Sequence, residues 1–579
     1  MAAFALCVLA AVQSPGLLPT QEAAVEAAVL KVLGLGPGAA ELRAFVAART
    51  PRAIADEAFG RLVRDLGSAA FAAREAAQSE LARGGPEALD RLQAALRASK
   101  DPEQAARLRG ALGQITGKDW SPRGTAAYRA AVRALARRAD AASVPCLLGA
   151  LPVLAEDDEL LAAVWRGLDA RAVRDKAVPA PCVGARTDPR AERRALAAFL
   201  LGRRGDGEQR RLAAEMLADA DPGVRLRAAQ GLLGSGDLSG VPVLVALVDA
   251  KPVTLAWEAE ELLVWLAGEG APTVRVGDGR DGAKARAAWE RWREKANPDW
   301  KAAAAAPGRP LLLLLRDDQS LGRSPKEYCP TVILGCDGQI RWKAVSPEGW
   351  CVLIDRVTSQ GRALGFSWPD PDPRPMWSGY LPAFAEFSIG GKLKSGPELK
   401  FAQGYNGGIA VRRWAAGWTL VAGPERFGFI PQGQDTVAHW KAMPRYKDNP
   451  KDPGQEVNGR LLDERDGMLS YFCQLPPSNT LRWTIFIEPG SGECPPFPTP
   501  TFMRLNKAPN WNEVCVGSGA GVVSVANGRV WETVGGQRMW ESPVEWGARL
   551  IVSPALPLVR FGFDDLAIPR RALAFKPPR

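Results

Sequence analysis

The stretch Trp511–Ile568 decides how the C-terminal half folds, and it reads WNEVCVGSGAGVVSVANGRVWETVGGQRMWESPVEWGARLIVSPALPLVRFGFDDLAI. Apolar and polar residues alternate on both sides of Asn527-Gly528, a dipeptide typical of two-residue β-hairpin turns. The alternation predicts antiparallel strands that bury one face. A strand at Trp511–Val514 opens the stretch, and one at Val559–Ile568 closes it.

This succession of strands resembles the last strands of concanavalin- and laminin-G-like jelly rolls, especially the 3-keto-disaccharide hydrolase-like domains. Two earlier segments follow the order of that family. They are an opening strand at Phe427–Pro431 and a long Leu-Arg-containing strand, Leu481–Gly490, that ends in Pro-Gly. The resemblance implies a jelly-roll β-sandwich over residues 426–579.

Residues 310–425 also change to a period of two and are expected to form a separate β-rich hairpin region. The segment Thr331–Trp342 reads as a strand, an Asp-Gly turn and a second strand. A hairpin that ends in Trp is similar to one blade edge of a β-propeller. The alternative fold is therefore a propeller that takes in the whole C-terminal half.

Residues 21–300 are rich in Ala, Leu, Arg and Glu at helical spacing and predict an α-solenoid. The clearest unit is Asp221–Gly234 followed by Val241–Leu247, in which Asp221 caps a helix and Pro222 occupies its first turn. This unit resembles a HEAT repeat, and a similar Asp-Pro start lies 33 residues earlier, at Asp188. Such helix pairs must stack, because one pair cannot bury its apolar stripe alone.

The amphipathic segment Ala283–Ala296 carries Trp289 and Trp292 three residues apart on one face. A tryptophan pair can bind a ligand, but we favour the interpretation that this helix closes the end of the solenoid. The chain then enters the linker Ala302–Pro310 before the β-rich half.

The N-terminal residues Ala2–Val12 form an apolar run of the length found in secretory signals. We therefore expect residues 1–20 to be a signal segment and the protein to be exported to the periplasm or outside the cell. The absence of a basic residue before Lys31 keeps a cytoplasmic location as the alternative. No later stretch is long and apolar enough to predict a membrane span.

The composition indicates a folded protein of several domains, with 579 residues and a formal net charge of +10. The one histidine, His439, excludes histidine-rich metal sites and leaves a single residue on which a catalytic triad could depend. The nine cysteines contain no Cys-x-x-Cys pair. Neither a metal site nor a cofactor is predicted.

A basic cluster in the solenoid has two interpretations; it comprises Arg190, Arg193, Arg194, Arg203, Arg204, Arg210 and Arg211. In the first, Arg190, Arg194, Arg203 and Arg204 bind the phosphates of a nucleic acid. In the second, which we favour, the cluster is a solvated helix face, because acidic residues are interspersed with it.

Glycoside hydrolysis is implied by the resemblance alone, and it needs two carboxyl groups beside the scissile bond. The candidate catalytic residues are Glu488, Glu493 and Asp466, with Trp483 and Trp511 placed to stack on a sugar. The family's Gly-Asn-Ser-Gly segment is replaced here by residues 490–493, Gly-Ser-Gly-Glu. This departure favours binding over catalysis.

We therefore expect an exported scaffold rather than an enzyme. The solenoid would hold a protein partner, and the β-sandwich would contact a glycan or another protein. Hydrolysis of a 3-keto-disaccharide-type glycoside and nucleic-acid binding by the basic solenoid are the alternatives.

Overall fold

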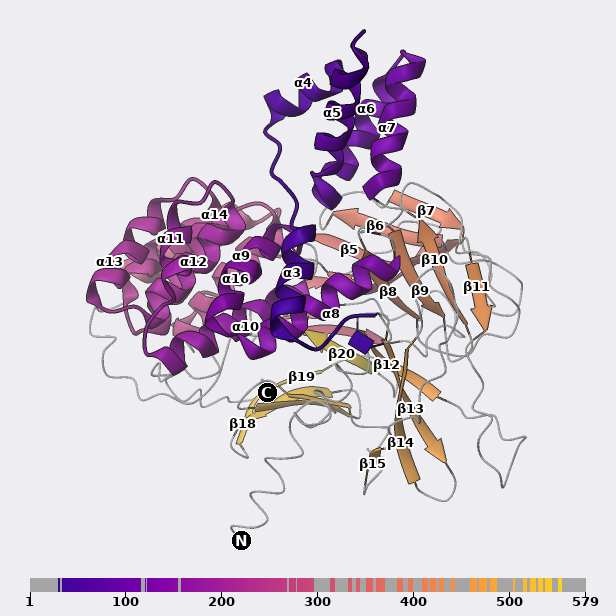
Figure 1. The fold of residues 1–579 in the computed structure, drawn as a ribbon. Coiled ribbons are helices and arrows are strands. Elements are labelled where there is room, and N and C mark those ends of the chain that lie inside the picture. Colours follow the sequence, from indigo (N-terminus) through magenta and orange to yellow (C-terminus); the bar gives the residue numbers. More distant parts are fainter. Residues whose placement is uncertain are drawn as a thin grey trace.

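A computed structural model describes most of the helical part and the strands of the β-rich part. The described residues are 30–295, apart from 32–33, 116–119, 121, 155–157, 268–269 and 278, together with strands β1–β20, Gly335 and Gly361. The N-terminal signal segment expected at residues 1–20 and the linker at 302–310 lie outside this range. Figure 1 shows the helices and the sheets as two adjoining groups.

The N-terminal part is all-helical and HEAT-like, as the sequence predicts. Its α-helices are α3 (Ala39–Arg49), α4 (Asp56–Asp65), α5 (Phe71–Ala82), α6 (Leu89–Ala98), α7 (Pro102–Gln114), α8 (Pro122–Arg138), α9 (Val144–Ala150), α10 (Asp158–Asp175), α11 (Ala180–Gly184), α12 (Ala191–Arg204), α13 (Gly207–Glu215), α14 (Pro222–Gly234), α15 (Val241–Leu247), α16 (Val253–Ala267) and α17 (Gly282–Lys295). Short 3₁₀ turns include η1 (Gly85–Ala88), η6 (Met216–Ala218) and η7 (Leu238–Gly240).

The helices pack in two layers. In one layer, α3, α8, α10, α12, α14 and α16 contact one another in that order. The shorter helices α9, α13 and α15 pack beside them. Helices α4–α7 fall between α3 and α8 in sequence, although α3 and α8 contact each other directly. This segment is therefore an excursion from the array, and Figure 1 shows it set apart from the other helices.

The repeat beginning at Asp221 folds as its sequence predicts. The Asp221 carboxylate accepts hydrogen bonds from the backbone N–H groups of Gly223 and Val224, at 2.8 and 3.1 Å, which satisfies two unpaired donors of α14. Helix α14 also crosses α12 closely. A Cβ atom on Gly202 would lie 2.7 Å from the backbone nitrogen of Leu232, so the crossing requires a glycine there.

The β-rich part consists of short antiparallel strands. They are β1 (Leu313–Asp317), β2 (Val332–Leu334), β3 (Ile340–Lys343), β4 (Trp350–Val357), β5 (Arg362–Pro369), β6 (Ala383–Ser388), β7 (Lys394–Glu398), β8 (Ile409–Trp414), β9 (Gly417–Ala422), β10 (Arg426–Pro431), β11 (His439–Ala442), β12 (Gly459–Arg465), β13 (Met468–Leu475), β14 (Asn479–Phe486), β15 (Met503–Leu505), β16 (Val514–Gly517), β17 (Gly521–Ala526), β18 (Arg529–Val534), β19 (Gln537–Pro543) and β20 (Leu550–Pro554).

These strands form five four-stranded sheets, and this order corrects the two-sheet sandwich that we expected for residues 426–579. The orders are β20-β1-β2-β3, β4-β5-β6-β7, β8-β9-β10-β11, β12-β13-β14-β15 and β16-β17-β18-β19. A sandwich distributes its strands between two facing sheets, whereas here strands that follow one another in the chain pair within each sheet, except that β20 pairs with β1. The sheet β8–β11 also crosses residue 426, where we had placed a domain boundary.

The hairpin predicted around Asn527-Gly528 is present. Ala526 of β17 pairs with Arg529 of β18, which leaves Asn527-Gly528 as a two-residue connection. The closing strand expected at Val559–Ile568 lies outside the described residues. Strand β20 pairs instead with β1, so the two ends of the β-rich part meet in one sheet.

One hydrophobic cluster joins the end of the helical array to the sheets. It combines residues of α14–α17 with Ile333, Trp342, Val357 and Ala363 from β2–β5. Trp289 and Trp292 belong to this region, with ring centroids 5.1 Å apart in an edge-to-face arrangement. Trp289 is fully buried in this cluster and is therefore a core residue.

Candidate functional site

The candidate catalytic residues are not brought together by the described part of the chain. Glu488, Glu493, Asp466 and Trp511 lie outside it, and Trp483 lies in β14 opposite Tyr471 of β13. The hydrolase assignment therefore stays a prediction. Among the described residues, no cluster of His, Cys, Asp and Glu could hold a metal ion. Within the same part of the chain, no helix is long and apolar enough to cross a bilayer.

The four arginines named as phosphate ligands form ion pairs inside the helical part. Arg190 pairs with Glu87 of η1, and Arg194 contacts both carboxylate oxygens of Asp219, at 2.8 and 2.9 Å. Arg203 and Arg204 both form ion pairs with Asp169 of α10. Each guanidinium thus faces a carboxylate of the chain itself, which weakens the positive field available to a phosphate backbone.

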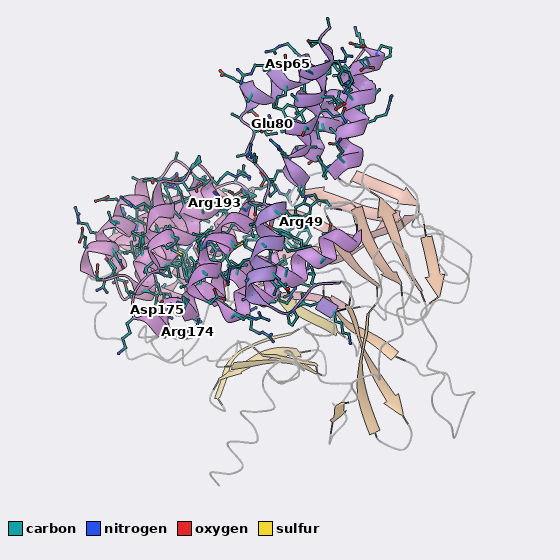
Figure 2. All side chains as sticks on the ribbon, in the orientation of Figure 1. Arg49, Asp65, Glu80, Arg174, Asp175 and Arg193 are labelled. Carbon is teal, nitrogen blue, oxygen red and sulfur yellow. The ribbon has the colours of Figure 1, made fainter. Side chains whose placement is uncertain are left out.

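These pairs also connect successive helices. Arg204 makes a two-pronged contact with Asp169, at 2.8 and 2.9 Å, which joins α12 to α10. Arg174 of α10 donates to the carbonyl oxygens of Arg138 and Ala139, at the end of α8. Figure 2 labels Arg174 and Arg193 among the charged side chains of the array.

The Arg194–Asp219 pair is the best defined of the set. The hydrogen bond from Arg194 is the main cause that lowers the pKa of the Asp219 carboxyl, although partial burial opposes it. The same bond raises the pKa of Arg194. The side chains are only 18% and 13% exposed, so the charges are screened less than on an open surface.

Two further residues of the basic cluster have different surroundings. Arg211 approaches Glu215 at 3.6 Å on an exposed part of α13. Arg210 is half-buried, and within the described ranges its guanidinium has neither an ion pair nor a hydrogen bond. It is the residue of the cluster whose charge is not neutralised by a described neighbour.

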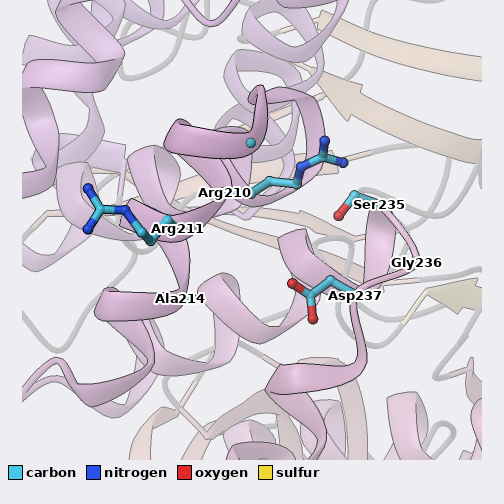
Figure 3. Close-up of a pocket in the computed structure, with 7 residues that line it drawn as sticks. Arg210, Arg211, Ala214, Ser235, Gly236 and Asp237 are labelled. Atoms are coloured by element: carbon cyan, nitrogen blue, oxygen red, sulfur yellow. The ribbon is translucent and has the colours of Figure 1, made fainter.

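Arg210 lines a shallow surface hollow of about 410 Å³, which is our candidate binding site. The hollow is bordered by Gly207, Arg210, Arg211, Ala214, Ser235, Gly236 and Asp237. Figure 3 shows Arg210 directed toward the turn at 235–237, whereas Arg211 is directed to the opposite side of α13. The hollow thus lies between α13, the second helix of one repeat, and the turn that follows α14, the first helix of the next repeat.

The turn presents acceptors to this hollow. The Ser235 hydroxyl donates to the Leu232 carbonyl at 2.9 Å, so its lone pairs stay available. The Asp237 carboxylate accepts a bond from the Ser239 N–H through Oδ1, at 2.8 Å. Gly236 between them has φ +84°, a conformation that glycine adopts without strain.

A second cluster is fully buried where the array meets the sheets. Arg341 of β3 donates to Glu261 at 2.7 Å and lies 3.3 Å from Glu260, and all three side chains are fully buried. Glu260 also accepts bonds from the Trp289 indole and the Val276 N–H. Burial raises the pKa of Glu260, against the opposing effect of Arg341.

This cluster, the junction cluster, holds the two parts together rather than forming a reaction centre. The charged atoms of Arg341, Glu260 and Glu261 face one another and are closed off from solvent. Sequence reasoning missed it, because Arg341 and Glu261 are 80 residues apart and lie in different predicted regions.

Comparisons with known proteins add no argument about the function. No family model and no curated protein matches the chain. A crystal structure of Chaetomium thermophilum Raptor aligns with 94% of this chain at 12% identity and a TM-score of 0.20. The chain covers 61% of that protein, and a TM-score this low carries no conclusion about fold or activity.

Proposed function

We propose that this protein is a scaffold whose helical array holds a protein partner. The observation that supports the proposal is that ion pairs connect neighbouring helices of the array and so brace it. Buried or half-buried ion pairs connect α10 with α12 through Asp169, and α14 with α16 through Arg227 and Glu258, which lie 2.6 Å apart. A braced surface loses little conformational entropy when a partner binds, which favours affinity.

The junction cluster extends this bracing to the sheets. Arg341 of β3 contacts two carboxylates of α16, so these ion pairs join the sheet β20-β1-β2-β3 to the array. A partner that contacts both parts would meet surfaces already held at a fixed spacing. This arrangement suits an extended protein ligand.

For the β-rich part we propose a closed ring of five blades, the propeller alternative of the sequence interpretation. Three observations support it: β20 completes the sheet begun by β1, β4 contacts β8, and β16 contacts β20. Pairing of the first and last strands within one blade is a means of closing such a ring. The ring would be the second binding face, for a glycan or a protein.

Export of the scaffold remains part of this proposal and rests on the apolar run at Ala2–Val12. Expression of the chain with and without residues 1–20, followed by separation of periplasm, medium and cytoplasm, tests it. Removal of these residues should retain the protein in the cytoplasm. An unchanged distribution would refute export by this segment.

Site-specific photo-crosslinking tests the scaffold function. A photoreactive amino acid is placed at Phe71 of α5 or Val173 of α10, whose side chains are 62% and 50% exposed. We expect a defined polypeptide to be crosslinked and to be displaced by excess unmodified protein. The proposal fails if no polypeptide is captured. A glycosidase activity that is lost in Glu488→Gln would instead support the hydrolase.

A further inference from the structure

The hollow beside Arg210 combines one cation with two acceptors. The Arg210 guanidinium forms one wall, and Ser235 and Asp237 form the other. A guanidinium presents parallel N–H donors that match the two oxygens of a carboxylate. The free lone pairs of Ser235 and Asp237 match N–H donors. A ligand for this site therefore carries a carboxylate and N–H groups close together.

We propose that the hollow binds an acidic side chain, and the adjoining backbone N–H, of a peptide segment in the protein partner. This inference rests on the proposed scaffold function and names the chemistry that one part of its surface recognises. The acidic side chain would pair with Arg210, and the peptide N–H would donate to Ser235 or Asp237. A peptide supplies both groups within one residue.

The same geometry disfavours a phosphate backbone. Phosphodiesters have no N–H donor for Ser235 and Asp237 of the turn. The nearby Arg194, Arg203 and Arg204 already face carboxylates of the chain. A nucleic acid would meet an isolated cation instead of the row of cations that gives strong salt-dependent binding.

Fluorescence anisotropy of a labelled oligoglutamate peptide with the full chain tests this assignment. Arg210→Gln should weaken the binding about tenfold, because a charge-assisted contact is lost. Arg83→Gln is the control: it removes the same charge from an exposed residue outside the hollow, whose partner is Glu80. It should change the dissociation constant less than about twofold, since exposed pairs contribute little.

Two further measurements make the outcome decisive. Oligoglutamine should not bind, and any binding of oligothymidylate should be the same in Arg210→Gln as in the wild type. The assignment is overturned if oligoglutamate does not bind, if both variants lose equal affinity, or if oligothymidylate depends on Arg210 as strongly as the peptide does. The unfolding temperature of Arg210→Gln should match the wild type, because Arg210 has no partner in the described part to lose.

The hollow and the scaffold function can fail separately. If photo-crosslinking captures a polypeptide whose binding is unchanged in Arg210→Gln, the scaffold function stands and the hollow assignment falls. If oligoglutamate binds through Arg210 but no polypeptide is captured, the hollow is an acidic-peptide site and the proposed partner is absent.

Discussion

Arg341 is the single residue on which the contact between the array and the sheets depends most. Replacing it by methionine leaves Glu260 and Glu261 buried without their guanidinium. Loss of one member of a buried ion pair typically costs about 3–5 kcal/mol. We expect the junction to unfold at a clearly lower denaturant concentration, followed by tryptophan fluorescence, since Trp289 contacts Glu260.

Arg286→Met provides the control for this prediction. Arg286 contacts Asp249 at 3.3 Å and Glu290 at 3.0 Å, and its side chain is 40% exposed. Exposed pairs contribute about 1 kcal/mol or less. Equal unfolding midpoints for Arg341→Met and Arg286→Met would show that the junction cluster does not stabilise the protein.

Asp219 gives a prediction about pH. Because Arg194 lowers its pKa in the folded state, the pair stabilises the fold above the unfolded pKa of about 3.9. That stabilisation is lost as the pH falls through the lower, folded pKa. Unfolding temperatures measured from pH 6 down to about 3 should fall less steeply in Asp219→Asn than in the wild type. Parallel curves for the two proteins would contradict this role.

Arg210 shows why the candidate site could be predicted only in part. The sequence identified the basic cluster, but the four arginines singled out for phosphate binding proved to be paired. Their partners are remote: Asp169 lies 35 residues from Arg204, and Glu87 lies 103 residues from Arg190. Local charge spacing cannot reveal which cation is left without a carboxylate, because that depends on which helices become neighbours.

The crossing of α12 and α14 provides a prediction at the scale of elements. In Gly202→Ala the new methyl group would lie 2.7 Å from the Leu232 nitrogen, so the two helices must separate. Overpacking of this kind costs about 1–3 kcal/mol. Gly113→Ala in α7 is the control, because nothing lies within 4 Å of its added Cβ. It should be neutral or stabilise by up to about 1 kcal/mol, as alanine favours helix.

Thermal unfolding of the helical part, followed by circular dichroism at the helix band, separates these two variants. A lower midpoint for Gly202→Ala alone supports the close crossing. If both variants have the same unfolding midpoint, or if Gly113→Ala has the lower one, the contact between α12 and α14 does not limit the stability of the helical part.

The elements themselves were largely readable from sequence, but the partners of the strands were not. Val241–Leu247 was predicted as a helix and is α15 with the same bounds, because capping and helical spacing are local signals. Alternation likewise located β17 and β18. It indicates that a strand has one buried face, and it does not say which strand comes next to it. The sandwich expectation failed at that step.

At the scale of the whole molecule, pairing of β20 with β1 is the contact that closes the β-rich part. Leu315 lies opposite Val552 in the antiparallel ladder. Opposed residues have Cα atoms roughly 4.5–5.5 Å apart, within the range of a disulfide. We therefore expect Leu315→Cys with Val552→Cys to form a crosslink, identified by mass spectrometry of the joined peptides.

The matched control shifts one partner by a single residue. Leu315→Cys with Ser553→Cys should crosslink poorly, because Cβ directions alternate along a strand and these two positions face opposite sides of the sheet. Since the same sheet contains β2 and β3, which carry Ile333 and Arg341, the crosslink should also raise the unfolding midpoint of the junction cluster. Equal crosslinking of both pairs would refute this register. A crosslink that leaves the unfolding midpoint of the junction cluster unchanged would show that closing the ring does not stabilise its attachment to the array.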